Sequence, residues 1–352
     1  MAGLDGIDSY SVGPIEIYNP MEIADNAKLV RAVAESSEIA TALPSVDFYD
    51  RPGSGNVLEI LAAGIILKTE DPSLPAAVVY TGENNNHAAE ILSAALEARL
   101  GIKLQTARVQ ILNTVIGKMS GIVTDANQIR EQALKEVSPG LQKAYLVEKF
   151  NRIQISRINL PGFSRGIEVF EEKDDLLPFE EAKLYGHNAA HALLGSMLKI
   201  NNAKFISEAT CRPDIMELAR DAFLHESGVA LCHKYAGIDP LFTADGFSAY
   251  VHDLLSRMVN PNLRDSVDRV TRDMRRKLGW NDRIAGTMRL CIAQGITPWR
   301  YARGAAAAIR ILAEEEGKDH KTELDSLWSD PGCDPDIASN MKDLIKLQDS
   351  NL

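Results

Sequence analysis

The stretch PAAVVYTGE (residues 75–83) decides the fold class, because it is a short, continuous apolar run between two helical patterns. Such runs are typical of strands that are buried on both faces of a parallel sheet. The helical patterns are NVLEILAAGIILK at residues 56–68, entered from a Gly/Ser loop, and residues 85–100. Further strands are predicted at residues 107–116 (ARVQILNTVI) and 143–150 (KAYLVEKF). This alternation indicates an α/β layer structure.

Upstream of this region, the pattern predicts one more strand and one more helix. SVGPIEIYN (residues 11–19) alternates apolar and polar residues, as a strand does. Residues 24–43 predict a helix that is capped by Asp25 or Asn26 and ends before Pro44.

Downstream of about Leu177, the strand signals stop. Pro178 suits the first turn of a helix that runs to about Ile200. Four more helices are predicted at residues 213–227, 247–258, 281–294 and 297–316. The predicted fold is therefore α/β and then all-α. It consists of an incomplete Rossmann-like, doubly wound domain at residues 1–172 and a mainly helical C-terminal substrate domain at residues 173–352.

Composition excludes several classes of protein. The chain has 352 residues, 45% of them apolar and 25% charged, which is normal for a globular protein. Its formal net charge of -11 gives no electrostatic support for nucleic-acid binding. The N-terminus is not a signal peptide, and the longest apolar stretch, VLEILAAGIIL, is too short to span a membrane. Four cysteines without a C-x-x-C pair predict free thiols in a reducing compartment, so we expect a cytoplasmic protein.

An α/β half followed by a helical half suggests a two-domain dehydrogenase, which needs a glycine turn to hold the cofactor pyrophosphate. No G-x-G-x-x-G occurs in the chain. The nearest candidate is GSGNVL (residues 53–58), where Gly53, Gly55 and Asn56 could offer backbone N–H groups to a phosphate. The alternative interpretation is a flexible loop that only leads into the helix, and on this weak pattern it is favoured.

The stretch KLYGHNAAH (residues 183–191) is the strongest candidate for a catalytic set. At roughly 100° per residue, Lys183, His187, His191 and Asn188 fall at roughly 0°, 40°, 80° and 140° around an α-helix, so all four share one side. A lysine that loses solvation in a cleft becomes a usable general base. Asn188 and His191 could then hold a substrate hydroxyl and stabilise a developing oxyanion. The alternative is the polar edge of a packed helix.

These residues resemble the catalytic helix of the polyol-specific long-chain dehydrogenases, the mannitol dehydrogenase family, through the pattern K-x-x-x-x-N-x-x-H. A second block, NPNLRDSVDRVTRDMRRKLGWNDRI (residues 260–284), is similar to a run in mannitol-1-phosphate 5-dehydrogenases, the members that the chain resembles most. TGENNNHAAEIL (residues 81–92) resembles a segment after a cofactor-domain strand, with Gly82 in place of a cysteine. GITPWRYARGAAAAI matches the late helix of the family.

The resemblance implies metal-independent hydride transfer between NAD or NADP and a polyol, a polyol phosphate or a sugar acid. Lys183 would be the general acid/base, and Asn188 and Asn84 the amides that stabilise the oxyanion. His191 would orient the substrate oxygen, and Glu180 would aid proton transfer. Glu83, beside Asn84, joins Gly53, Gly55 and Asn56 as a cofactor-binding candidate.

Two departures from the family pattern limit what carries over. The resemblance starts late, so that the first strand, glycine loop, helix and second strand of the family have no counterpart here. A miscalled start, a fragment and a loss of cofactor binding all remain open. In addition, the segment from Val115 to Lys118 replaces a V-D-R run whose aspartate can contact polyol hydroxyls. Mannitol itself is therefore not the expected substrate.

A basic cluster lies within residues 260–284 and consists of Arg269, Arg272, Arg275, Arg276, Lys277 and Arg283. Arginine forks bind phosphates and carboxylates, so the cluster could hold an anionic substrate group. The alternative, favoured for most members, is ion pairing with the interleaved Asp265, Asp268, Asp273 and Asp282. We keep Arg269 and Lys277 as candidate substrate contacts. The remaining histidines have no metal-ligand spacing, so no metal is predicted.

Two functions stay open at this point. The first is an NAD(P)-dependent oxidoreductase. The second, prompted by the missing glycine loop, is a non-catalytic sugar-binding or regulatory homologue. The oligomeric state is not predicted.

Overall fold

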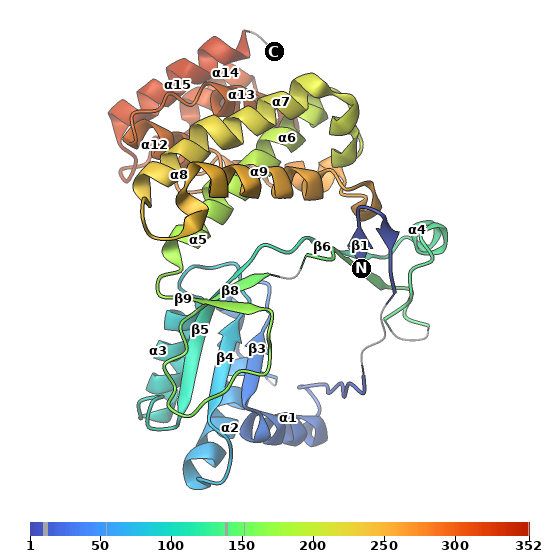
Figure 1. The fold of residues 1–352 in the computed structure, drawn as a ribbon, viewed down its shortest axis with the longest axis vertical. Coiled ribbons are helices and arrows are strands. Elements are labelled where there is room, and N and C mark those ends of the chain that lie inside the picture. The colour runs from blue at the N-terminus through green and yellow to red at the C-terminus, as the bar shows by residue number, and fades with distance from the viewer. Residues whose placement is uncertain (10–12, 54, 138–139, 151, 351) are drawn as a thin grey trace. The chain divides into compact units, whose positions relative to one another are not determined.

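The computed structural model describes residues 1–9, 13–53, 55–137, 140–150, 152–350 and 352, and the chain divides into two compact units (Figure 1). Unit 1 comprises Met1–Ser9, Ser120–Lys149 and Glu181–Leu352, and unit 2 comprises Tyr10–Met119 and Phe150–Glu180. Each unit is described by itself. This division groups residues 1–9 and 120–149 with the helical part, whereas the sequence predicts one boundary between residues 172 and 173.

Unit 2 is built on a five-stranded sheet in the order β3-β4-β5-β8-β9. The strands are β3 (Glu38–Thr41), β4 (Ala77–Thr81), β5 (Val109–Ile116), β8 (Ile153–Ser156) and β9 (Phe170–Lys173). Strands β3, β4 and β5 are parallel, β8 is antiparallel to β5, and β9 is parallel to β8. The strand predicted from PAAVVYTGE is confirmed, because β4 is buried along its whole length and lies between two parallel neighbours.

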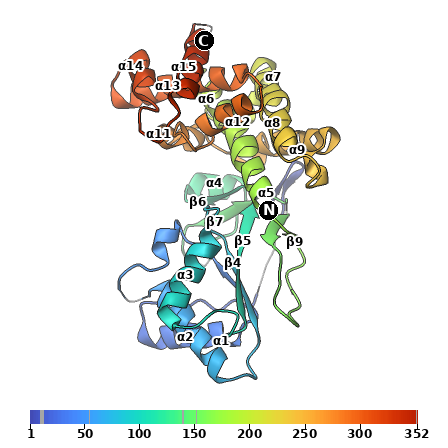
Figure 2. The ribbon, with the colours of Figure 1, turned by 90° about the vertical axis from the view of Figure 1, so that its left-hand side faces the viewer.

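The helices of unit 2 are α1 (Ile23–Glu35), α2 (Val57–Glu70) and α3 (Ala88–Leu100), with a short 3₁₀ turn, η1 (Val46–Phe48). One face of β4, with Ala77 and Val79, packs against side chains of α2 and α3 (Figure 2). The opposite face, with Val78 and Tyr80, is covered by apolar side chains of residues 153–170. The crossovers β3-α2-β4 and β4-α3-β5 thus form half of a doubly wound domain, as the predicted incomplete Rossmann-like fold requires.

Three of the predicted elements in this region differ from the structure. The helix predicted at residues 24–43 is wrong at its end, because α1 stops at Glu35 and Glu38–Thr41 is strand β3. The strand predicted at residues 11–19 is wrong over residues 13–19, which form no strand, and its first two residues lie outside the described part. The strand predicted at residues 143–150 exists as β7 (Ala144–Val147), but it pairs with β6 (Ser120–Val123) in unit 1.

Unit 1 is mainly helical, as predicted, with a small β-rich part. The β-rich part holds β1 (Ala2–Gly3), β2 (Gly6–Ile7), the β6–β7 pair and α4 (Ala126–Glu131). The helical part begins at Glu181, the last residue of α5 (Leu177–Glu181), and continues in the π-helical turn η2 (Ala182–Asn188) and in α6 (Ala189–Ile200). A second helix consists of α7 (Pro213–Ala222), the π-helical turn η4 (Phe223–Gly228) and α8 (Val229–Lys234).

The remaining helices complete unit 1. They are α9 (Ala244–Met258), α10 (Val267–Thr271), α11 (Met274–Lys277), α12 (Ala285–Ala293), α13 (Trp299–Glu316), α14 (His320–Ser326) and α15 (Pro335–Asp349), with 3₁₀ turns η3 (Ile206–Cys211), η5 (Pro240–Phe242) and η6 (Pro261–Leu263). The core lies between α6, α7, α13 and α15. Helices α6 and α13 approach closely, because a Cβ at Gly304 would lie 2.7 Å from Leu193 Cγ. Among the described residues, no helix combines the length and apolar character needed to cross a membrane.

Candidate active site

The stretch KLYGHNAAH lies on a helix whose geometry is not that of a regular α-helix. Lys183, His187 and Asn188 belong to the π-helical turn η2, and His191 lies in the first turn of α6. In a π turn the hydrogen bonds run from residue i to i+5, so each residue advances by less than the roughly 100° assumed for an α-helix. The angles predicted for these side chains are therefore wrong in detail. π turns within α-helices occur frequently at functional sites, which supports the assignment of this one.

Two neighbouring elements hold the π turn in place. Gly186 faces η4, where a Cβ would lie 2.7 Å from Phe223 Cε2, so the two π turns pack directly on each other. On another side, α12 approaches the ring of Tyr185, since a Cβ at Gly286 would lie 2.6 Å from Tyr185 Cε1. The buried Thr287 hydroxyl shares its hydrogen between the Arg283 carbonyl at 2.6 Å and the Tyr185 carbonyl at 3.2 Å. The widened turn is thus fixed by packing and by a side-chain hydrogen bond.

The face of η2 carries concentrated positive charge. His187 is buried, and this burial, followed by the charges of His191, Arg257, Lys183 and Arg283, holds the pKa of His187 well below its usual range. His187 is therefore neutral at physiological pH. Lys183 and Asn188 are half-buried, and the Asn188 amide forms no hydrogen bond within the described part of the chain. An amide in this position is available to a ligand oxygen.

His191 lies beside a carboxylate that the sequence analysis assigned only to ion pairing. His191 Nε2 is 3.2 Å from Asp265 Oδ2, and the same carboxylate binds the Arg269 guanidinium at two points, each 2.7 Å. Burial by itself would raise the pKa of Asp265, but His191 and Arg269 outweigh it and lower this pKa to about 2. Asp265 was already present in the block at residues 260–284. Its contact with His191 could not be read from the sequence, because 74 positions separate the two residues.

Most of the basic cluster is engaged in ion pairs, as the favoured interpretation predicted. Arg269 pairs with Asp265, Arg276 with Asp273 and Asp282, Arg283 with Asp282, and Arg275 with Glu316 and Glu323. Asp268 pairs with Lys199. Lys277 is buried and donates to the Arg272 carbonyl. Burial, followed by the charges of Arg283 and Arg276, lowers the pKa of Lys277 to about 8. The roles of Arg269 and Lys277 as substrate contacts stay predictions.

The other two predicted catalytic residues belong to unit 2. Asn84 is exposed in the turn after β4, at the carboxyl end of the parallel strands. Ligands of open α/β sheets bind at this end. Glu180 is buried in α5. That Asn84 and Glu180 join the lysine set remains a prediction.

That Gly53, Gly55, Asn56 and Glu83 hold the cofactor stays a prediction, although some of the polar groups around them are already engaged within unit 2. Asn56 caps α2 by accepting from Glu59 N–H at 3.2 Å, and Leu58 N–H donates to the Tyr49 carbonyl at 3.0 Å. The amides of Leu58 and Glu59 in the first turn of α2 are thus already bonded within the protein. Gly53 and Gly55 both have positive φ angles, 122° and 82°, which glycine adopts more readily than other residues. The backbone conformation alone therefore explains why these two residues are glycines. Ser54 between them lies outside the described residues.

Glu83 is likewise occupied within unit 2. Its buried carboxylate accepts from Thr41 Oγ1 at 2.7 Å, from Leu43 N–H at 2.8 Å and from the Tyr49 hydroxyl. Through these three hydrogen bonds, Glu83, which follows β4, connects to the end of β3 and to Tyr49, directly after η1. The arrangement accounts for Glu83 without a cofactor.

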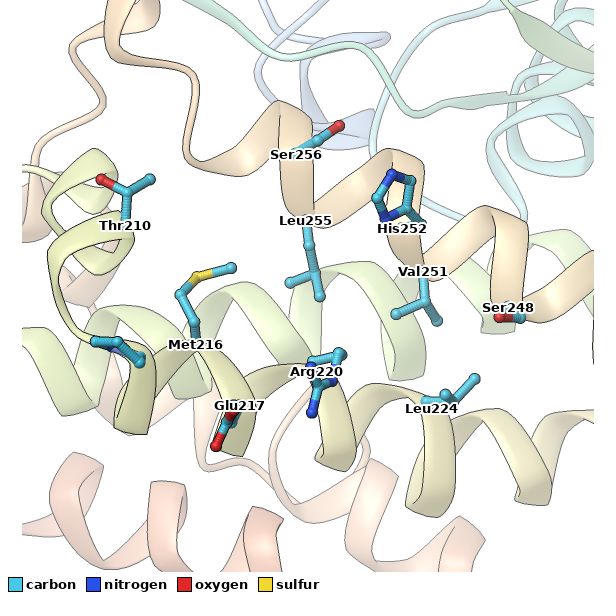
Figure 3. Close-up of a pocket in the computed structure, with 11 residues that line it drawn as sticks. Thr210, Met216, Glu217, Arg220, Leu224, Ser248, Val251, His252, Leu255 and Ser256 are labelled. Atoms are coloured by element: carbon cyan, nitrogen blue, oxygen red, sulfur yellow. The ribbon is translucent and has the colours of Figure 1, made fainter.

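A cavity of about 510 Å³ lies elsewhere in unit 1, between α7 and α9 (Figure 3). Its floor is apolar, with Met216, Val251 and Leu255, and Arg220 and His252 lie on opposite sides of it. The residues that line it include none of the predicted site residues. Within the described residues, His, Cys, Asp and Glu side chains form no group of three or more that could hold a metal ion.

Comparison with known proteins identifies the helical part. Residues 175–342 match the family model of the mannitol dehydrogenase C-terminal domain. This match includes KLYGHNAAH and the block at residues 260–284, and it confirms the resemblance found in them.

Two solved structures share the fold over 92% of this chain and 75% of their own. One is a Pseudomonas fluorescens mannitol 2-dehydrogenase in ternary complex with NAD and D-mannitol, with 16% sequence identity and a TM-score of 0.63. The other is a D-sorbitol dehydrogenase in substrate-free form, with 13% identity and a TM-score of 0.68. At such identities the likeness concerns the fold.

Proposed function

We propose that the chain is an oxidoreductase that transfers a hydride between a nicotinamide cofactor and a carbon of a polyol, a polyol phosphate or a sugar acid, without a metal ion. The observation that carries this proposal is that Lys183 and Asn188 lie in the widened turn η2 and His191 in the next turn, within residues that match the mannitol dehydrogenase C-terminal domain. The NAD and D-mannitol of the Pseudomonas fluorescens complex support the choice of cofactor and substrate class.

Each of the three side chains has a separate task in this reaction. In the oxidation direction Lys183 Nζ accepts the proton of the substrate hydroxyl, and in the reduction direction it returns this proton. The Asn188 amide donates to the oxygen while negative charge develops on it, without delivering a proton. His191 orients the substrate by a hydrogen bond with one of its oxygens. The nicotinamide, when bound, accepts or supplies the hydride. We leave the pyrophosphate contacts unassigned, because the Leu58 and Glu59 amides at the start of α2 are already bonded within the protein.

One observation favours a second function. The occupied amides at the start of α2 and the saturated carboxylate of Glu83 suit a sugar-binding or regulatory homologue that has lost cofactor binding. In this alternative the polar face of η2 would bind a polyol or a sugar acid without reacting with it.

A binding titration followed by an activity panel separates the two functions. Fluorescence titration of the full chain with NADH and NADPH tests cofactor binding. Turnover is then measured with neutral polyols, polyol phosphates and sugar acids, and with the matching ketoses. Lys183→Met should lower kcat by at least about 10²-fold, as expected for a general acid/base. Lys199→Met, on α6 and paired with the exposed Asp268, is the matched control and should retain activity. Sugar binding without cofactor binding or turnover would overturn the oxidoreductase.

A further inference from the structure

Three side chains contact one another in series: His191 on α6, Asp265 directly before α10, and Arg269 in α10. His191 Nε2 has no aligned hydrogen-bond partner within the described residues, although Asp265 Oδ2 lies 3.2 Å away. The Asp265 side chain is 8% exposed, and the Arg269 guanidinium binds both of its oxygens. A buried ring nitrogen requires a partner. Hydrogen bonds at catalytic residues are often misaligned without substrate and tighten when it binds.

The backbone fixes where this carboxylate lies. The Ile206 N–H donates to the Asp265 carbonyl, and the Val267 N–H donates to the Lys204 carbonyl, each at 2.9 Å. Asp265 is thus held in a short antiparallel bridge directly before α10. Its register is set by two hydrogen bonds that do not involve its side chain.

Helix packing brings this bridge to His191. A Cβ at Gly195 would lie 2.5 Å from Val270 Cγ1, so only a glycine lets α10 approach α6 this closely. His191 lies one turn before Gly195 on the same face of α6, since residues at i and i+4 are neighbours on a helix. The close contact between Gly195 and Val270 therefore brings α10, and Asp265 directly before it, next to His191.

We propose that Asp265 is a positioning residue that holds His191 in the tautomer with the proton on Nε2. An ionised carboxylate only accepts hydrogen bonds, so Nε2 must carry the hydrogen that points to it. Nδ1 is then left with a lone pair, which accepts a hydrogen bond from a second hydroxyl of the substrate, because the hydrogen of the reacting hydroxyl goes to Lys183 Nζ. Arg269 holds the carboxylate from its other side. The consequence for catalysis rests on the proposed oxidoreductase function, whereas the tautomer itself does not.

The tautomer can be measured directly on the full chain. In ¹⁵N-histidine-labelled protein, long-range ¹H–¹⁵N spectra distinguish a protonated from an unprotonated ring nitrogen, and His191→Gln assigns the signals. We expect the neutral His191 ring to carry its proton on Nε2. A wild-type ring that carries it on Nδ1 would overturn the inference, whether or not any variant folds. In Asp265→Asn the amide can donate to Nε2, and the tautomers should mix or invert.

Kinetics provide the second readout. Asp265→Asn should lower kcat by about 10²-fold, as a misplaced catalytic group does, and leave the KM of the cofactor unchanged. Asp268→Asn, three residues further on in α10 and paired at the surface with Lys199, should leave both the tautomer and kcat unchanged. Val270→Ala controls for lost stability, since it removes core packing between α10 and α6 while Asp265 and His191 are kept. A normal kcat in Asp265→Asn overturns the catalytic part. If the wild-type chain shows no turnover, the proposed function fails, and the tautomer measurement still decides whether Asp265 positions His191.

Discussion

Glu148 and Arg257 form a buried two-point ion pair in unit 1, with Arg257 Nε 2.9 Å from Glu148 Oε2 and Arg257 Nη2 2.6 Å from Oε1. The Glu148 side chain is 2% exposed and that of Arg257 is 11% exposed. Glu148 follows β7, and Arg257 lies in the last turn of α9. The pair therefore attaches the small β-rich part of unit 1 to its helices. It also holds a cation whose field helps to lower the pKa of His187.

Glu148→Gln should lower the free energy of unfolding of unit 1 by about 3 kcal/mol, because the buried Arg257 loses its two-point charged partner, although Asp253, which is half exposed, still pairs with it. The three tryptophans, Trp280, Trp299 and Trp328, all lie in unit 1, so tryptophan fluorescence during urea unfolding reports on this unit. Glu131→Gln is the control, since Glu131 pairs with Arg264 while 60% exposed, and it should cost at most about 1 kcal/mol. Equal losses in the two variants would contradict the role given to the buried pair.

Gly186→Ala should destabilise unit 1 by about 1–3 kcal/mol, although alanine favours helices more than glycine does. The added methyl would lie 2.7 Å from Phe223 Cε2. Phe223 cannot move freely, because its ring packs against Phe247 and Tyr250 with centroids 5.8 and 5.9 Å away. Adding Phe223→Leu to Gly186→Ala should recover part of the loss in urea unfolding. Gly332→Ala, which adds a methyl into open space, should leave stability nearly unchanged.

The sequence predicts strands well where burial is complete and poorly where it is partial. β4 is buried on both faces, and its apolar run was sufficient to identify it. β8 (IQIS) and β9 (FEEK) carry few apolar side chains, and their place in the sheet depends on distant pairing partners. The end of α1 was missed because EIAT (residues 38–41) continues the helical spacing of apolar residues. Its conversion to strand β3 depends on parallel pairing with β4, which a local pattern does not contain.

The candidate site shows the same limit. The spacing of Lys183, Asn188 and His191 identified the helix that carries them, but the π turn follows from contacts with Phe223 and α12. Alternating Arg and Asp letters at residues 260–284 correctly indicated ion pairs. Which aspartate meets His191 depends on the close packing of α10 on α6 at Gly195, a relation between residues far apart in the chain.

The anion affinity of the site should fall above about pH 8 if Lys277 contacts substrate. With its pKa lowered to about 8, Lys277 is charged below this pH and neutral above it. The KM of a sugar acid should therefore rise from pH 7.5 to 9.5, while that of a neutral polyol stays level. Lys277→Met should remove the difference between the two substrates. A sugar acid whose KM rises equally in Lys277→Met would exclude Lys277 as the cause.

The lowered pKa of Lys277 also makes the stability of unit 1 depend on pH. The pKa of Lys277 is lower in the folded chain than its ordinary value of 10.5, so between about pH 8 and 10.5 the unfolded chain binds more protons. The contribution of Lys277 to stability therefore rises with pH across this window and is lost as pH falls through about 8. Urea unfolding of unit 1, followed by tryptophan fluorescence, should show this rise in wild type relative to Lys277→Met. A constant difference between the two proteins from pH 7.5 to 10 would contradict it.

Glu83→Gln decides whether Glu83 is structural or holds a cofactor. Its carboxylate accepts from Thr41, Leu43 N–H and Tyr49, and burial, together with Glu83, raises the pKa of Tyr49. A glutamine would turn an N–H₂ group toward one of these donors, which should cost about 1–3 kcal/mol. Unit 2 contains no tryptophan, so hydrogen exchange of peptides that cover β3 and β4 is the suitable measurement, and protection there should fall. Glu35→Gln, which removes a surface pair with Arg31, should leave this protection unchanged. Unchanged protection in Glu83→Gln with a raised cofactor KM would instead make Glu83 a cofactor ligand.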